Sequence, residues 1–218
     1  MSSKITFLDP AIAAYIGAHT TPPSELEQRL IDATQAMPES MMQIGFPQAR
    51  FMALLTRLLV PTTVVEIGVF TGYSALVVAQ ELTTDATLIA CDISDEWTSI
   101  GRPFWQEAGV ADRIDLRIGP ASDTLAVLPA ETRVDLAFID ADKTGYLGYV
   151  EQLIPLLHDR SVVLVDNVLW DGDVADESAS GTSTIALREF NDAMVADDRL
   201  DVALLPIGDG LSMITLAR

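Results

Sequence analysis

The sequence predicts an α/β fold, with a mostly parallel seven-stranded sheet, helices on both faces and an antiparallel last strand. From residue 63 onward, short apolar runs alternate with helical patterns, which is typical of parallel strands joined by crossover helices. Near the C-terminus two apolar runs are separated by only four residues, and so short a link forces an antiparallel hairpin. The 218 residues, of which 49% are hydrophobic, suffice for a full core in a single domain.

The first 45 residues are expected to form a helical segment ahead of the sheet. Pro22 and Pro23 break the chain, and the pair Ser24 and Glu27 has the spacing of a capping box that begins a helix. A second helix is expected to end before Pro61. Its apolar stripe is expected to pack in the core and consists of Phe51, Leu54, Leu55, Leu58 and Leu59.

Seven apolar runs supply the expected strands. The first run is β-branched and continuous, as in a strand that is buried on both faces. Helices are expected between the runs, for example over residues 73–82 and 146–157. The expected strands cover residues 63–67, 87–91, 114–118, 134–139, 162–165, 202–206 and 211–216.

The formal net charge of −19 argues against nucleic acid and anionic membranes as partners, because phosphate groups would be repelled. A surface that serves only solubility is the alternative interpretation. A single cysteine, Cys91, excludes an internal disulfide, and neither a signal peptide nor an apolar run of about 18 residues is apparent. The sequence therefore predicts a cytoplasmic protein without a membrane span.

A glycine turn follows the first expected strand. Gly68 and Gly72 allow a tight turn close to a ligand, but the GxGxxG pattern of a pyrophosphate site is missing. Glu66 would repel phosphate and suits a cationic ligand, such as the sulfonium and amino group of S-adenosylmethionine. Asp92 ends the second strand, where a carboxylate typically accepts hydrogen bonds from ribose hydroxyls. The alternative is a plain turn from strand to helix.

Two neighbouring strands end in oxygen-bearing side chains. Asp140, Asp142 and Lys143 follow one strand, and Asp166 and Asn167 follow the next. The carboxyl ends of parallel strands line the ligand crevice of an open sheet, so these side chains are expected to converge. Oxygen donors without His or Cys favour Mg²⁺ over Mn²⁺ or Ca²⁺. Helix and strand caps are the alternative interpretation.

Lys143 is the candidate general base, because a lysine beside a metal can lose its proton whereas an arginine cannot. A surface lysine after a strand is the alternative. His19 and His158 lie in no ligand-like cluster, Cys91 is expected to pack in the core, and no GxSxG elbow supplies a hydrolase nucleophile.

Together these motifs resemble the metal-dependent class I O-methyltransferases, the family of catechol and caffeoyl-CoA O-methyltransferases. The likeness runs from about Met42 to the C-terminus, and the first forty residues show no counterpart. It rests on motifs at residues 66–74, 119–121, 138–143, 166–170 and 205–210.

The resemblance implies a Rossmann-like doubly wound sheet, a homodimer and S-adenosylmethionine as the methyl donor. It implies that residues 46–218 bind the donor and that residues 1–45 shape the acceptor pocket. The donor contacts that it implies are Glu66, Gly68, Ser74, Asp92, Ala121 and Asp142, with Met42 or Ile44 flanking them. It further implies that Mg²⁺ is held by Asp140, Asp166 and Asn167, that Lys143 is the base, and that Trp170 and Asp171 face the acceptor.

The acceptor is expected to be a small catechol-like phenol, such as a natural product, since few basic residues are present to hold the phosphates of a CoA ester. A tRNA-modifying methyltransferase, a nicotinamide-dependent oxidoreductase and a catalytically silent binding module are the alternatives. The net charge of −19 counts against tRNA as a substrate, and the missing GxGxxG counts against a nicotinamide cofactor. The intact set of metal and base residues counts against a silent module. Residues 171–182 are either a lid or a solvated connection.

Overall fold

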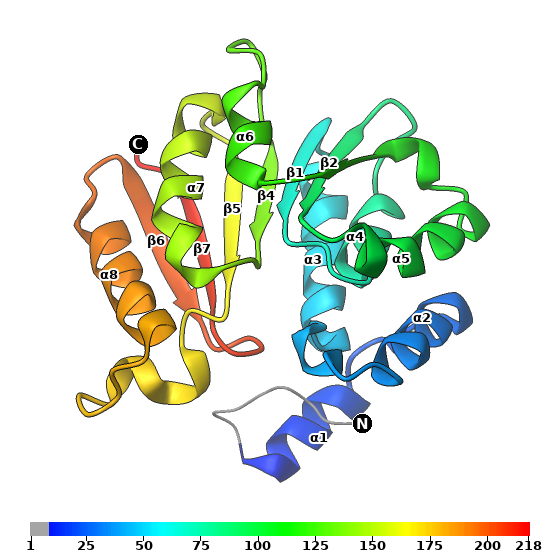
Figure 1. Cartoon of the computed structure of the whole chain (residues 1–218), viewed down its shortest axis with the longest axis horizontal. Helices are drawn as coiled ribbons and strands as arrows, with labels where there is room; N and C mark the ends of the chain where they lie inside the picture. Colours follow the sequence, from blue (N-terminus) through cyan, green and yellow to red (C-terminus); the bar gives the residue numbers. More distant parts are fainter. Residues whose placement is uncertain (1–8) are drawn as a thin grey trace.

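Within residues 9–218, the part of the chain that the computed structural model describes, seven strands form one sheet (Figure 1). They are β1 (Thr63–Ile67), β2 (Thr87–Asp92), β3 (Ile114–Ile118), β4 (Leu136–Ile139), β5 (Val162–Asp166), β6 (Leu200–Leu205) and β7 (Leu211–Leu216). Their order is β3-β2-β1-β4-β5-β7-β6. Strands β1 to β5 pair in parallel, whereas β7 runs antiparallel to both β5 and β6. The predicted fold class and hairpin are confirmed.

Helices cover both faces of the sheet. The α-helices are α1 (Pro10–Ala18), α2 (Glu25–Gln35), α3 (Phe46–Leu59), α4 (Tyr73–Ala79), α5 (Asp95–Glu107), α6 (Ala121–Ala126), α7 (Tyr146–Leu153) and α8 (Thr182–Ala196). The 3₁₀ turns are η1 (Ser40–Met42), η2 (Ala111–Arg113), η3 (Lys143–Gly145), η4 (Ile154–Leu156) and η5 (Trp170–Ala175). Successive strand residues point to opposite faces, so Val64 packs in the core with α2 to α5 and Val65 in the core with α6 to α8.

The capping box at the start of α2 is confirmed, with the Ser24 hydroxyl accepting from the Glu27 amide and the Glu27 carboxylate accepting in return. The helix expected over residues 146–157 is shorter than predicted. It ends at Leu153 and continues as the turn η4, which contains Pro155, because proline lacks the amide that an α-helix needs.

The apolar stripe expected to pack α3 in the core is confirmed in part. Phe51, Leu55 and Leu59 pack against the core, whereas Leu54 and Leu58 are 47% and 79% exposed. The fully buried face of the helix lies beside this stripe and consists of Gln48, Ala49, Met52, Ala53 and Thr56. Its alanines let α3 approach α4 and the sheet closely.

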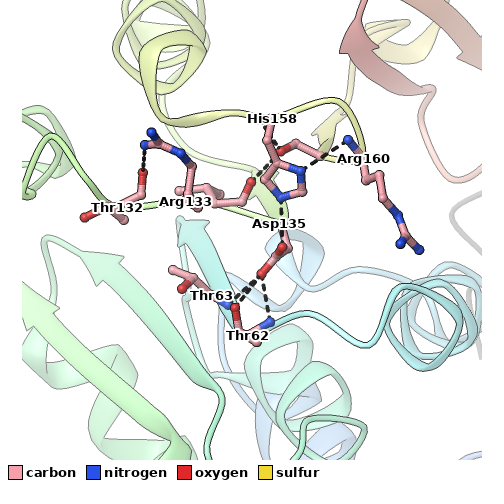
Figure 2. A network of polar contacts seen from close by, with 9 residues as sticks. Thr62, Thr63, Thr132, Arg133, Asp135, His158 and Arg160 are labelled. Atoms are coloured by element: carbon pink, nitrogen blue, oxygen red, sulfur yellow. Dashed lines mark hydrogen bonds and ion pairs between the residues drawn. The ribbon is translucent and has the colours of Figure 1, made fainter.

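Asp135 ties together the amino ends of three strands, at the edge of the sheet opposite the strands' carboxyl ends (Figure 2). Its carboxylate accepts hydrogen bonds of 2.8 and 2.9 Å from the Thr62 and Thr63 amides and contacts His158 Nε2 at 2.9 Å. Partial burial raises the pKa of Asp135, but these hydrogen bonds outweigh it and hold the pKa below its usual value. His158 therefore has a structural partner, as expected for a histidine outside any ligand cluster.

Among the helices of residues 9–218, none combines the length and the apolar character that crossing a membrane requires.

Candidate active site

A cavity of about 860 Å³ opens at the carboxyl ends of β1, β2, β4 and β5, and its size suits a small-molecule site. Most of the residues proposed from the sequence line it. These are Met42, Ile44, Gly68, Ser74, Asp92, Ala121, Asp140, Asp142, Lys143, Asn167, Trp170 and Asp171. Glu66 and Asp166 do not line the cavity, since both lie buried behind it with 1% and 2% exposure.

The glycine turn after β1 brings two strand ends into contact. Gly68 has a φ of +93°, and a Cβ atom there would lie 2.0 Å from the carbonyl oxygen of Asp140. The Asp92 carboxylate holds the turn by accepting 2.8 Å hydrogen bonds from the Val69 and Phe70 amides. Asp92 thus shapes the turn in addition to lining the cavity.

Glu66 lies beneath this turn as an incompletely paired carboxylate. Its Oε1 accepts a hydrogen bond from the Ser74 hydroxyl, and among the described residues its Oε2 has no hydrogen-bond partner. Burial raises the pKa of Glu66 to about 8, with repulsion from Asp140 and Asp92 adding to the effect and the Ser74 bond opposing it. A buried carboxylate in this state is stabilised by a cationic group that approaches from the cavity.

Lys143 is the centre of the polar cluster on the other side of the cavity. Its Nζ donates to Asp140 Oδ1 at 3.0 Å, to Asn167 Oδ1 at 2.8 Å and to the Tyr146 hydroxyl at 2.6 Å. The Tyr146 hydroxyl in turn donates to the carbonyl oxygen of Asp166 at 3.0 Å. The expected convergence of the strand ends is therefore present in the fold.

The oxygens around Lys143 fit a hard divalent cation. Within residues 9–218 no group of three or more His, Cys, Asp or Glu could hold a metal. A metal site here would have to combine the Asp140 and Asp166 carboxylates with a ligand of another kind, such as the Asn167 amide oxygen. Two of the three donors, Asp140 and Asn167, already converge on one positive group. Burial and, to a lesser degree, the neighbouring Asp140 carboxylate together raise the pKa of Asp166 to about 7, so added positive charge would relieve this site.

Sequence reasoning missed three residues in or next to the site, of which Tyr149 lines the cavity. Tyr146 stands one helical turn after Lys143, a spacing that could have signalled contact. Tyr149 donates a 2.6 Å hydrogen bond to Asp142 Oδ1 and lines the cavity. Gln48 is 3% exposed and lies against Gly208 beneath Asp166, but a glutamine within a helix carries no such signal.

The structure is an α/β sheet with a small-molecule cavity at the carboxyl ends of its strands. Comparison with known proteins shows the class to which it belongs. The model of a family described as O-methyltransferase matches residues 18–218. A Dictyostelium discoideum protein named "Probable caffeoyl-CoA O-methyltransferase 2" is 38% identical over 210 residues, which cover 94% of this chain and 91% of that protein. The caffeoyl-CoA O-methyltransferase of Mesembryanthemum crystallinum is 36% identical and covers 93% of this chain and 85% of its own length.

The fold has solved counterparts as well. The SAH-bound methyltransferase PaMTH1 of Podospora anserina superimposes with a TM-score of 0.87 at 27% identity, covering 95% of this chain and 94% of that one. These findings define an S-adenosylmethionine-dependent methyltransferase. The chain belongs to the O-methyltransferase family. Because the family match begins at residue 18, the expectation that the first forty residues have no counterpart was wrong for residues 18–40.

Proposed function

We propose that this O-methyltransferase moves the methyl group of S-adenosylmethionine to a hydroxyl of a small catechol-like phenol with the help of Mg²⁺. The observation that supports this best is the convergence of Asp140 and Asn167 oxygens on Lys143 at the cavity wall. An acceptor hydroxyl placed there meets oxygen ligands for a metal and an amine for its proton. In this proposal the chain works as one domain, in the cytoplasm and as a homodimer.

The donor occupies the half of the cavity beside β1 and β2. Its contacts would be Glu66, Gly68, Ser74, Asp92, Ala121 and Asp142, with Met42 and Ile44 at its edge. The buried Glu66 carboxylate attracts the positive amino acid part of S-adenosylmethionine, which supplies the methyl group. Because Gly68 has no side chain, the turn lies directly against the Asp140 carbonyl, and its backbone lines the donor half of the cavity.

The acceptor occupies the half beside β4 and β5. There Asp140, Asp166 and Asn167 would hold Mg²⁺, which supplies positive charge that stabilises a deprotonated acceptor oxygen. Lys143 takes the hydroxyl proton as general base, and its Nζ is oriented by the Asp140 oxygen and the Tyr146 hydroxyl. The oxygen then attacks the methyl group in line with the departing sulfur, and Trp170 and Asp171 border the acceptor.

Charge favours a free phenol over a CoA ester. Within the described residues Lys143 is the one cationic side chain that lines the cavity, alongside five carboxylates, namely Asp92, Asp140, Asp142, Asp171 and Asp209. A CoA ester carries several phosphates, which the negative charges lining this cavity would repel. The proposed likeness to the caffeoyl-CoA relatives therefore extends to the reaction and not to the acceptor. A tRNA substrate is disfavoured for the same reason, since the net charge is −19.

The test is methyl transfer from labelled S-adenosylmethionine to catechol, caffeic acid and caffeoyl-CoA, each with Mg²⁺ and with EDTA. We expect EDTA-sensitive labelling of the free catechols and weaker labelling of the CoA ester. The Asp140→Asn variant should lose the Mg²⁺-dependent turnover. EDTA-insensitive transfer would overturn the metal role, and a preference for caffeoyl-CoA would overturn the assignment of the acceptor.

A further inference from the structure

The segment that borders the acceptor half has an unusual backbone. Trp170 and Asp171 have φ values of 47° and 53°, and Asn167 just before them has a φ of 58°. Non-glycine residues rarely adopt this left-handed conformation, and it persists only where the surroundings hold it in place. The Trp170 ring also lies 5.7 Å from Lys143 Nζ, so the position of this ring defines the wall beside the proposed base.

One side of the segment is held by the turn between β6 and β7. The Leu169 amide donates to the Asp209 carbonyl at 3.0 Å, and the Asp171 amide donates to the Asp209 carboxylate at 2.8 Å. These bonds fix the chain before and after Trp170. They leave residues 173–181 to be held by another part of the molecule.

The other side is held by one arginine of α8, the helix beside this segment in Figure 1. Arg188 donates from Nε to the Val174 carbonyl at 2.9 Å and from Nη1 to the Ala179 carbonyl at 2.9 Å. Its Nη2 donates to the Asp173 carbonyl at 2.6 Å and also to the Asp176 carbonyl. One guanidinium thus collects four backbone carbonyls, which only a planar group with several fixed donors achieves.

Other contacts of residues 171–181 with the rest of the molecule are few. None of these residues is fully buried; Val174 is partly buried against the core, and the Thr184 hydroxyl donates to the Asp173 carboxylate at 3.5 Å. The segment also carries four acidic side chains, at Asp171, Asp173, Asp176 and Glu177, which repel one another. The positive charge of Arg188 offsets this repulsion from inside the loop.

We propose that Arg188 is a positioning residue: it holds residues 173–179, the direct continuation of Trp170 and Asp171 at the cavity wall, and thereby sets acceptor affinity. It acts through Trp170 and touches neither donor nor acceptor. The segment is then an anchored wall and not a freely opening lid. The statement about acceptor affinity rests on the proposed function, in which Trp170 borders the acceptor, whereas the anchoring does not.

Two variants and a control test this. Arg188→Met removes all four hydrogen bonds at similar length, and Arg188→Lys keeps the charge without the planar fork. Arg57→Met is the matched control. Arg57 lies on α3, remote from the segment, and its exposed guanidinium makes two hydrogen bonds to the Glu81 carboxylate. For each protein we would measure amide hydrogen exchange, S-adenosylmethionine affinity by calorimetry, and KM and kcat for catechol.

We expect Arg188→Met to speed amide exchange at residues 171–179 at least tenfold, with exchange in β1 and β2 unchanged. The KM for catechol should rise at least tenfold while donor affinity stays within twofold of the wild type. The KM and exchange rates of Arg188→Lys should lie between those of the wild type and those of Arg188→Met. The Arg57→Met variant should match the wild type. Unchanged exchange in the segment, or an equal loss of donor and acceptor affinity, would refute the proposal.

The two proposals fail in distinguishable ways. If the wild type does not methylate catechol, the proposed function fails, and the exchange experiment still decides whether Arg188 anchors the segment. If the wild type is active and the segment loosens in Arg188→Met with no change in KM, the proposed function stands and the inference about acceptor affinity is overturned.

Discussion

The contact between the first glycine turn and the end of β4 gives the sharpest prediction, which concerns Gly68→Ala. The new Cβ would lie 2.0 Å from the Asp140 carbonyl oxygen, whereas real Cβ contacts essentially never fall below 3.0 Å. The Asp140 peptide must therefore withdraw by roughly 1 Å, the difference between these two distances, and overpacking of this kind costs about 1–3 kcal/mol. A left-handed backbone adds about 1–2 kcal/mol for any residue with a Cβ.

Gly109→Ala is the matched control. Gly109 also has a positive φ, of +69°, but a Cβ there would meet nothing within 4 Å. The free energy of unfolding of Gly109→Ala should fall only by the backbone contribution, about 1–2 kcal/mol, whereas that of Gly68→Ala should fall by about 2–5 kcal/mol. Each kcal/mol lowers the Tm of a chain this long by about 2–4 °C. The difference between the two variants isolates the steric effect.

The assay is calorimetric melting together with methyl transfer. Because Asp140 carries a proposed metal ligand, a shift of about 1 Å should reduce turnover by roughly 100-fold in Gly68→Ala. Gly109→Ala should keep its turnover. Equal melting temperatures for the two variants, or full activity in Gly68→Ala, would show that the close approach of β1 and β4 is not what the glycine serves.

Three further changes separate charge, chemistry and scaffold. Burial raises the pKa of Glu66 from 4.5 to about 8, so the stability that this group contributes to the fold is lost as the pH rises between these values. The Tm of the donor-free wild type should therefore fall relative to that of Glu66→Gln from pH 5 to 8. A Tm difference that stays constant over this range would contradict the argument. Lys143→Arg keeps a positive charge but cannot act as a base, so methyl transfer should drop about 10²–10⁴-fold with donor affinity unchanged, and near-normal turnover would remove Lys143 from that role. Asp135→Ala leaves the Thr62 and Thr63 amides without their acceptor, so the free energy of unfolding in urea should fall by about 1–3 kcal/mol. Turnover should stay unchanged, and a change in kcat would mean that this end of the sheet is coupled to the cavity.

Local signals explain what could be predicted. The strands at residues 63–67, 114–118 and 211–216 match their predicted bounds. The first is a continuous β-branched run, which fits a strand covered on both faces, and the other two are short apolar runs interrupted by polar residues. The Ser24 and Glu27 capping box was equally local. The cluster of Asp140, Lys143 and Asn167 followed from topology, since parallel strands bring their carboxyl ends to one edge.

Non-local contacts explain what could not be predicted. Periodicity predicted an apolar stripe on α3, but the way the helix packs on α4 and the sheet decided that Met52 and Ala53 are buried while Leu54 and Leu58 are exposed. The place of Gln48 beside Gly208 depends on segments 160 residues apart, and a single sequence carries no trace of such a pair.

The sequence by itself determined the order of strands and helices, the reversed last strand and the chemistry available at the strand ends, because these depend on neighbours within a few residues. Tertiary structure alone decided that the Tyr146 hydroxyl joins the oxygens around Lys143 and which carbonyls Arg188 contacts. It also decided that Glu66 is buried with one unpaired oxygen. The physical reason is that burial and hydrogen bonding between distant segments depend on how the chain packs as a whole, and packing is not written in any local pattern.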